Sequence, residues 1–331
     1  MPSPSHAIRF EEEPSVRKLF AIIGHPVAHS LSPRFQQAAF EKAGIDAAYL
    51  PFDIAPETLP RAIDALRTLG VSGFNVTIPH KEAILPLLDE LSPTAQALGA
   101  VNTVIAKDGR LRGENTDAPG FLAALEMFLG TNALPLPSSA VVFGAGGSAR
   151  SVLWALTRLN LSRITLVNRT RERGDALVRS LPFLSKTIPT FALDDPSWKK
   201  ELPGGPPSPP LTPPEKDTHA PRTLLVNTLS LQAFAGDDSL FPPLRDLSLA
   251  SSVLLDLSYV SSLSNEKGLG GLTPFLAMGR PFGAPCQNGL GMLLMQGALA
   301  FRLWTGLDPS TEVMEGELRQ ATGQGDLWKS L

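Results

Sequence analysis

The stretch VVFGAGGSAR, residues 141–150, decides the fold class of the second half of the chain. It is typical of an apolar strand that ends in a glycine turn and runs into a helix. Gly144 permits the tight turn, Gly146 lets backbone amides approach a pyrophosphate, and the small Ala149 allows the helix to pack closely on the strand. Because the N-terminus of a helix attracts anions, this order favours a dinucleotide site over a purely structural turn.

The end of the next strand indicates which dinucleotide is bound. Sites for NAD usually place Asp or Glu there, to accept a hydrogen bond from the ribose 2′-hydroxyl. In this chain the strand ends in Asn168, Arg169 and Thr170, and Arg171 and Arg173 follow. Guanidinium groups bind phosphate through paired hydrogen bonds, so the pattern predicts NADP as the cofactor. The alternative is a basic, solvated helix start.

Strand-like and helix-like patterns alternate on both sides of this loop. Short apolar runs, each followed by a segment with helical spacing, are typical of α/β units with mostly parallel sheets. The sequence therefore predicts an α/β protein. The expected strands are 19–24, 47–54, 72–78, 138–143, 163–168, 223–228 and 252–259, and the expected helices are 33–43, 57–69, 81–88, 149–159 and 289–304.

The composition excludes several classes of protein. Lys and Arg number 29 against 32 Asp and Glu, without a block of like charge, so nothing indicates binding to nucleic acid or an anionic membrane. A single cysteine, Cys286, excludes a disulfide framework, and the five histidines show no metal-ligand spacing. No apolar run reaches the roughly 20 residues of a membrane span, and the first residues lack a secretory pattern. We therefore expect a cytoplasmic protein.

Polar residues stand at the strand ends of the first half, where a buried sheet would be apolar. Ser30 and Ser32 carry two hydroxyls at an expected helix N-terminus, which attracts carboxylates, although Ser32 followed by proline is also a common N-cap. In NVTIPHK, period-two alternation places Asn75 and Thr77 on one face, and Lys81 opens a helix. Taken alone, Lys81 would be a solvated surface residue. Two further polar clusters follow, at 101–103 and 114–117.

Together these motifs closely resemble the shikimate dehydrogenase family. The motifs S-L-S-P, G-F-N-V-T-I-P-H-K, G-A-V-N-T, N-T-D, G-A-G-G-S-A-R, N-R-T and N-G-L-G-M-L-L-M-Q occur in the family's order, across about residues 19–307. The resemblance implies an enzyme that reduces 3-dehydroshikimate to shikimate with NADPH, a step of chorismate and aromatic amino-acid biosynthesis.

The resemblance also implies a role for individual residues. Lys81 and Asp117 match the catalytic pair. Hydride delivery to a ketone generates an alkoxide, for which Lys81 can supply a proton or a positive charge, and Asp117 can hold the ammonium group in place. The implied substrate-site residues are Ser30, Ser32, Asn75, Thr77, Asn102, Tyr259 and Gln296. The implied cofactor-site residues are Gly144, Ala145, Gly146, Gly147, Ser148, Ala149, Asn168, Arg169, Thr170, Arg173, Leu257 and Gly289.

The length of 331 residues favours two domains. Prolines in the run 203–221 lack N–H donors, so this segment reads as an exposed insertion, and its P-x-x-P spacing leaves open a partner-binding role. Residues 261–271 read as a second insertion. The expected division is a flexible arm at 1–18, an α/β substrate-binding catalytic domain at 19–117, a connecting helix and linker at 118–137, a Rossmann-like NADP-binding domain at 138–285, and C-terminal helices at 286–331 that return to the first domain.

The sequence departs from the family pattern at two places where the nicotinamide is expected to bind. After Asn227 and Thr228 stands LSLQAF, where the family usually has a small residue, Thr or Ser, and a glycine turn. The motif D-x-x-Y-x-P keeps Asp256 and Tyr259 but lacks the proline.

Two other functions remain open at this point. One is a quinate/shikimate dehydrogenase of catabolism that uses NAD or NADP, which the absence of an acid at 168–170 disfavours. The other is a non-catalytic sensor of shikimate-like ligands, which the presence of both Lys81 and Asp117 disfavours. We expect a monomer or homodimer whose partners are small molecules.

Overall fold

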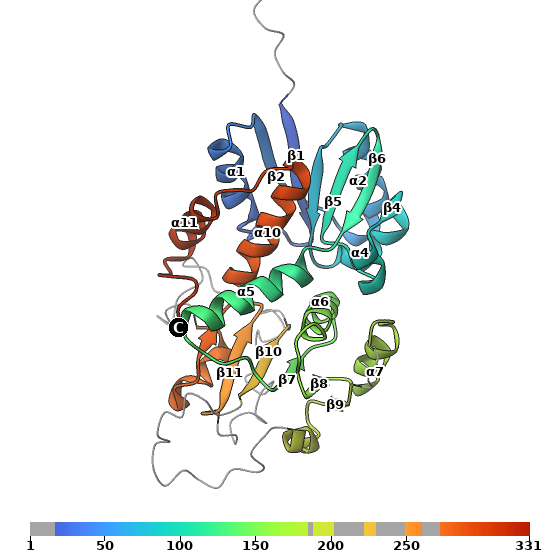
Figure 1. Cartoon of the computed structure of the whole chain (residues 1–331). Helices are drawn as coiled ribbons and strands as arrows, with labels where there is room; N and C mark the ends of the chain where they lie inside the picture. Colours follow the sequence, from blue (N-terminus) through green and yellow to red (C-terminus); the bar gives the residue numbers. More distant parts are fainter. Residues whose placement is uncertain (1–16, 185–187, 202–221, 230–248, 260–271) are drawn as a thin grey trace, which may run out of the picture.

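The computed structural model describes residues 17–184, 188–201, 222–229, 249–259 and 272–331. Most of the expected arm at 1–18 and the two expected insertions, 203–221 and 261–271, lie outside the described residues. The described chain forms two sheets with helices packed on them (Figure 1). It is an α/β protein, as predicted.

The first sheet has the strand order β2-β1-β3-β5-β6-β4. β1 pairs in parallel with β2 and β3, whereas β5 is antiparallel to both β3 and β6, and β4 is parallel to β6. Three of the five pairings are parallel, as expected, and the two that involve β5 are antiparallel. The strands are β1 (Lys18–Gly24), β2 (Ala47–Asp53), β3 (Gly73–Val76), β4 (Glu90–Leu91), β5 (Thr103–Lys107) and β6 (Arg110–Glu114).

The antiparallel part arises from a tight hairpin. Lys107 pairs with Arg110, so only Asp108 and Gly109 connect β5 to β6. Both residues have positive φ, 52° and 74°. Asp-Gly is a favoured pair for such two-residue turns, whose twist matches that of the flanking strands. The dipeptide is a local signal that the sequence interpretation did not use.

The helices of the first half are α1 (Ser32–Lys42), α2 (Leu59–Thr68), α3 (His80–Ala83) and α4 (Pro93–Leu98), with short 3₁₀ turns η1 (Pro56–Thr58) and η2 (Leu85–Leu87). The expected helix at 81–88 is wrong in extent, because α3 ends at Ala83 and the chain turns into η2. Pro86 explains the break, since its ring clashes with the preceding turn and it has no N–H to donate. Lys81 therefore stands on a single helical turn.

The second sheet is wholly parallel, with the order β12-β11-β10-β7-β8-β9. From β7 the chain adds β8 and β9 on one side of the sheet. It then returns to the other side of β7 and adds β10, β11 and β12 in turn. Ligands of such sheets bind at the carboxyl ends of the strands, where the order reverses, and the glycine loop follows β7. The elements are β7 (Ser139–Phe143), α6 (Gly147–Leu156), β8 (Arg163–Asn168), α7 (Arg171–Arg179), β9 (Thr190–Ala192), η3 (Pro196–Glu201), β10 (Thr223–Asn227), β11 (Ser252–Asp256), α9 (Pro274–Ala277), η6 (Arg280–Phe282) and β12 (Cys286–Gln287).

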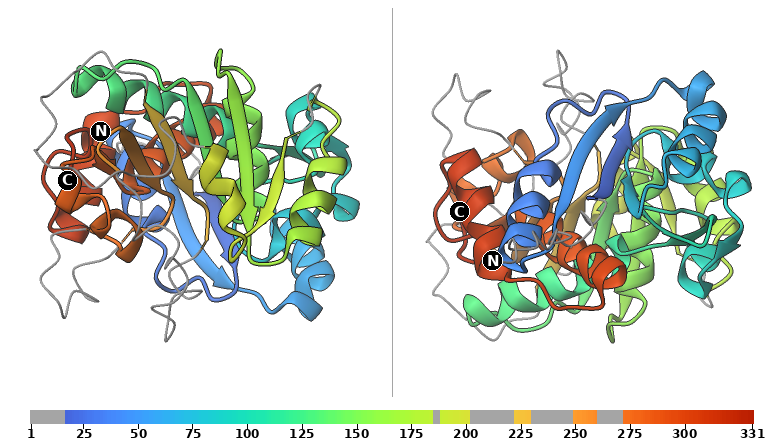
Figure 2. Two further views of the ribbon diagram at one scale, coloured as in Figure 1. Left: turned by 90° about the horizontal axis from the view of Figure 1, so that it is seen from below. Right: turned by 90° about the horizontal axis from the view of Figure 1, so that it is seen from above.

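Two long helices, α5 (Asp117–Thr131) and α10 (Leu290–Thr305), pack along each other (Figures 1 and 2). The approach is close, because a Cβ at Gly120 would lie 2.7 Å from Cβ of Gln296. α10 then reaches the first sheet, where Trp304 Nε1 donates to Val104 O at 2.9 Å. The prediction that the C-terminal helix returns to the first half is confirmed. α11 (Thr311–Thr322) follows and packs on α1.

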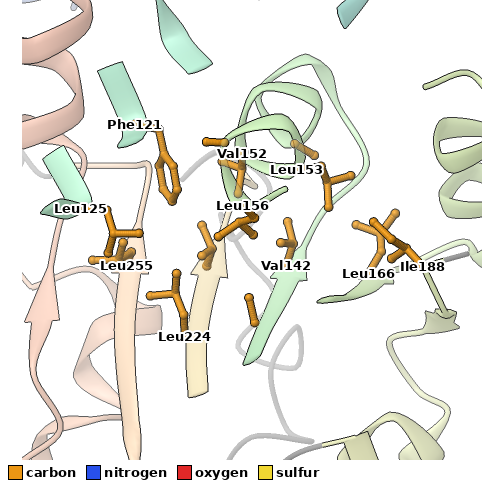
Figure 3. Close-up of a cluster of buried hydrophobic side chains, with 14 of the residues drawn as sticks. Phe121, Leu125, Val142, Val152, Leu153, Leu156, Leu166, Ile188, Leu224 and Leu255 are labelled. Atoms are coloured by element: carbon orange, nitrogen blue, oxygen red, sulfur yellow. The ribbon is translucent and has the colours of Figure 1, made fainter. Parts of the chain in front are cut away.

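Apolar side chains fill the space between each sheet and its helices. Figure 3 shows the cluster beneath the glycine loop, where Leu153 and Leu156 of α6 and Phe121 of α5 pack above Val142 of β7. Met292 of α10 lies against this cluster. The cluster fixes α6, and with it the glycine loop, relative to the strand ends.

Candidate active site

Lys81 and Asp117 form an ion pair. Lys81 Nζ lies 2.6 Å from Asp117 Oδ2, and the side chains are 14% and 7% exposed. Lys81 comes from α3, just beyond β3, and Asp117 opens α5. Removing one partner of a pair this enclosed would leave the other charge uncompensated. Lys81 and Asp117 are 36 positions apart in the sequence. The backbone of Lys81 is also held from the segment between them, because Val101 N donates to Lys81 O at 2.8 Å.

Asn102 connects this pair to α10. Its Nδ2 lies 2.9 Å from Asp117 Oδ1, 2.9 Å from Thr116 Oγ1 and 3.2 Å from Gln296 Oε1. An amide nitrogen has two hydrogens, so these three acceptors share them. Both carboxylate oxygens of Asp117 are thereby engaged. The structure thus brings together four residues that the sequence assigned to the site, Lys81, Asn102, Asp117 and Gln296.

Asn75 lies on the other side of Asn102. Its Nδ2 donates to Asn102 O at 3.1 Å and to Thr103 Oγ1 at 3.0 Å, and its Oδ1 accepts from the Tyr49 hydroxyl at 2.7 Å. Thr77, two residues on, is half-buried, and its methyl group lies so close to Gly24 that a Cβ there would come within 2.4 Å of it. Asn75 belongs to the polar network, whereas Thr77 stands beside it without a side-chain hydrogen bond among those described.

The S-L-S-P segment lies next to the segment that follows β11. Ser32 N donates to Ser30 Oγ at 3.3 Å, and Ser32 is buried. Ser32 is the first residue of α1, whose N-cap is Leu31 without a side-chain hydrogen bond, so the capping alternative for Ser32 is wrong. Tyr259 packs against the apolar cluster that contains Leu31, and burial raises the pKa of Tyr259. Tyr259 therefore lies in the same region of the fold as the two serines.

The glycine loop follows β7 and faces Lys81. Gly144 has φ of 106°, and a Cβ there would lie 2.5 Å from Thr228 Oγ1, so only glycine fits. Gly146 is the N-cap of α6 and supplies no side-chain hydrogen bond to its first amides. A Cβ at Gly147 would lie 3.8 Å from Cβ of Lys81. The first turn of α6 therefore offers amide donors to an anion directly beside the ion pair.

The basic residues lie at the end of β8. Asn168 is buried, and its Nδ2 donates to Thr170 O at 2.8 Å. Arg169, Thr170 and Arg173 are exposed around the start of α7. Two guanidinium groups beside a helix N-terminus suit a phosphate, because the charges and the helix dipole act in the same direction.

Leu257 and Gly289 meet at the end of β11. Gly289 N donates to Ser258 O at 3.0 Å, and a Cβ at Gly289 would lie 2.1 Å from Leu257 O. Behind them, the buried Asp256 accepts hydrogen bonds from Asn227 Nδ2 at 2.9 Å and from Ser258 N at 2.9 Å. Burial raises the pKa of Asp256 to about 6. Of the departing run LSLQAF, only Leu229 falls within the described residues.

Sequence reasoning missed the contacts that join α6 to the first half. Arg150 Nη1 donates to Leu98 O at 3.3 Å, and Nη2 lies 3.4 Å from Glu82 Oε2. Ser151 Oγ donates to Asn115 Oδ1 at 3.4 Å. Of the partners in the first half, Glu82 follows Lys81 directly, and Asn115 stands two residues before Asp117. The only signal was that the motif G-A-G-G-S-A-R itself ends in Arg150.

The described residues form neither a metal-binding cluster nor a membrane-spanning helix. Within 17–184, 188–201, 222–229, 249–259 and 272–331, three or more His, Cys, Asp or Glu side chains nowhere gather as metal ligands do. In the same ranges, every helix is too short or too polar to cross a lipid bilayer.

Comparison with known proteins gives consistent matches over most of the chain. Residues 22–104 match the model of the shikimate dehydrogenase substrate binding domain, and residues 289–319 match that of the shikimate 5′-dehydrogenase C-terminal domain. A curated protein of a Geobacter species, named shikimate dehydrogenase (NADP(+)), is 42% identical over 303 residues, which cover 91% of this chain and 94% of the relative.

Solved structures match over a similar extent. A crystal structure of a shikimate dehydrogenase in complex with NADP+ has a TM-score of 0.72 and 34% identity, covering 92% of this chain and 95% of the other. The shikimate 5-dehydrogenase of Thermus thermophilus, in complex with NADP(H) and shikimate, has a TM-score of 0.69 and 36% identity, covering 92% of this chain and 99% of the other.

Proposed function

The chain belongs to the shikimate dehydrogenase family, and from this premise we propose how its residues carry the reaction. The enzyme is an NADP-dependent oxidoreductase that interconverts 3-dehydroshikimate and shikimate, a step of chorismate and aromatic amino-acid biosynthesis. The observation that supports our assignment of residues is the enclosed pair of Lys81 and Asp117 beside the glycine loop.

In the reductive direction, the Lys81 ammonium donates a proton to the oxygen of the substrate ketone as negative charge develops on it. Asp117 accepts a hydrogen bond from Lys81 Nζ at 2.6 Å, which holds the ammonium group in position. Asn102 holds the other carboxylate oxygen, so Asp117 cannot rotate away. When bound, NADPH supplies the hydride that reduces the ketone carbon.

The substrate is held by hydroxyl and amide groups, which suit a polyhydroxylated ring. We assign this role to Ser30, Ser32, Asn75, Thr77, Asn102, Tyr259 and Gln296. Support comes from the continuous contacts that join Gln296, Asn102 and Asn75, and from the packing of Tyr259 against the cluster that contains Leu31.

The residues of the second sheet fit NADP. The uncapped first turn of α6 would bind the pyrophosphate, with Gly144, Ala145, Gly146, Gly147, Ser148 and Ala149 forming the loop. Arg169 and Arg173, with Asn168 and Thr170, would bind the 2′-phosphate. Leu257 and Gly289, in close contact at the strand ends, would meet the nicotinamide. We accordingly propose 19–117 as the substrate domain and 138–285 as the NADP-binding domain.

We further propose that the enzyme acts in the cytoplasm, where its single cysteine, buried Cys286, needs no disulfide partner. We also propose that it acts as a monomer or a homodimer.

The test is a matrix of initial rates with purified enzyme, combining shikimate or quinate with NADP or NAD. We expect turnover with shikimate and NADP to exceed each other combination by at least about tenfold in kcat/KM, a difference of roughly 1.4 kcal/mol. Comparable rates with quinate or NAD would instead assign the enzyme to catabolism and contradict the role given to Arg169. Binding of NADP without turnover of either acid would favour a ligand sensor.

A further inference from the structure

Tyr49 is a buried hydroxyl-bearing residue that the mechanism above does not use. It lies in β2 with 3% of its surface exposed, and its ring packs near Trp304, with ring centroids 6.1 Å apart. Its hydroxyl donates to Asn75 Oδ1 at 2.7 Å. The two residues meet because β2 and β3 flank β1 on either side and both pair with it in parallel.

The hydrogen bonds of Asn75 leave only one position open to a ligand. Both hydrogens of its Nδ2 are used, by Asn102 O at 3.1 Å and by Thr103 Oγ1 at 3.0 Å. Its Oδ1 has two acceptor positions, of which Tyr49 fills one. The remaining position can accept a hydrogen bond from a substrate hydroxyl. Tyr49 thus restricts where this acceptor points.

Burial raises the pKa of Tyr49 well above its usual value, and the nearby Ser32, at the start of α1, opposes this only in part. The phenol therefore stays protonated and remains a donor to Asn75.

We propose that Tyr49 is a positioning residue for shikimate, whose hydroxyl fixes the side chain of Asn75. This role rests on the proposed substrate site. Tyr49 acts through Asn75, and it makes no contact with Lys81 or Asp117 among the described hydrogen bonds. Its loss therefore weakens shikimate binding and leaves proton transfer at Lys81 unchanged.

The test compares Tyr49→Phe, Asn75→Ala and the double variant in steady-state kinetics. Tyr49→Phe keeps the ring and removes only the hydroxyl. We expect its KM for shikimate to rise about five- to tenfold, the usual effect of one lost hydrogen bond, with kcat and the KM for NADP within about twofold of wild type. The double variant should match Asn75→Ala within about twofold, because residues that act through each other are not additive.

Thr322→Val is the matched control, because Thr322 is a buried hydroxyl in α11, hydrogen-bonded to Leu318 O and outside this network. The difference between its melting temperature and that of wild type shows how much stability is lost with a buried hydroxyl. Its KM values for shikimate and NADP should equal those of wild type. An unchanged KM for shikimate in Tyr49→Phe, additive effects in the double variant, or a variant that does not fold would each overturn the role of Tyr49.

Wild-type enzyme is assayed in the same experiment, with shikimate binding measured by calorimetry. Wild-type protein that binds NADP but neither binds nor oxidises shikimate would refute the proposed function, and the role of Tyr49 with it. Normal wild-type turnover together with an unaffected Tyr49→Phe would refute the role of Tyr49 alone.

Discussion

The Arg150 guanidinium lies 3.4 Å from the Glu82 carboxylate, and this ion pair ties the glycine-loop helix to the residue that follows Lys81. The same guanidinium donates to Leu98 O, the last residue of α4, at 3.3 Å. One side chain of α6 therefore contacts two elements of the first half. The distance between the first turn of α6 and Lys81 depends on these contacts.

Replacing Arg150 should impair alignment of the two halves. We expect Arg150→Ala to lower kcat/KM for shikimate and for NADP by about tenfold. The reason is that the variant loses a charged, hydrogen-bonded side chain that is only 15% exposed. Glu82→Gln should cost less than about threefold, since the Glu82 side chain is 52% exposed and solvent screens the pair. Steady-state kinetics on both variants measure the two effects.

Arg158→Ala serves as the control for Arg150. Arg158 lies just beyond α6 and its guanidinium stacks 4.5 Å from the Trp154 ring, away from the first half. The account of Arg150 fails if both variants lose the same activity.

Arg169 should determine the preference for NADP. We expect Arg169→Ala to raise the KM for NADP by about tenfold or more, while the KM for NAD and the KM for shikimate change less than about twofold. The reason is that only NADP carries the 2′-phosphate. Arg179→Ala, an exposed arginine at the opposite end of α7, is the control and should leave all three values unchanged. If Arg169→Ala raised the KM for NADP and the KM for NAD equally, Arg169 would not bind the 2′-phosphate.

Asp256 should make stability depend on pH. Its pKa in the folded protein is about 6, against an ordinary 3.8, so the folded state holds this proton more tightly. The resulting stability is fully present below about pH 4 and is lost as the pH rises through 6. We expect the unfolding free energy of wild type minus that of Asp256→Asn to fall by up to about 3 kcal/mol between these limits.

Urea denaturation of both proteins across this pH range measures the difference for Asp256. Because the two proteins share every other titrating group, effects of those groups cancel. A difference that stays constant, or that grows as the pH rises, would show that Asp256 is ionised in the folded protein at low pH.

Local patterns in the sequence located four strands of the second sheet, whereas the short strands β9 and β12 were not predicted. Strand β8 begins and ends at the predicted residues, 163–168, and α6 follows Gly146 as the turn chemistry requires. Two local features of the first half were not predicted: Asp108-Gly109 adds an antiparallel hairpin to the sheet, and Pro86 ends the helix that carries Lys81. Each of these signals was present in the sequence and was outweighed by the regular alternation of strands and helices.

The candidate site was less accessible from the sequence alone. Lys81 and Asp117 are 36 residues apart, and only the resemblance to a family paired them. The contact between Tyr49 and Asn75 depends on the order of three strands, and that between Arg150 and Glu82 depends on how two sheets are joined. Spacing along a chain does not encode such relationships, because they arise from packing of distant elements.

The account depends most on the role of Lys81, and Lys81→Ala tests it directly. The measurement is kcat for shikimate oxidation with NADP, together with the Kd for NADPH from fluorescence titration of the same protein. We predict that kcat falls by at least about 10³-fold, because the proton donor and acceptor is lost, while the Kd stays within about twofold of wild type. Turnover near the wild-type rate, or an equal loss of NADPH binding, would contradict it.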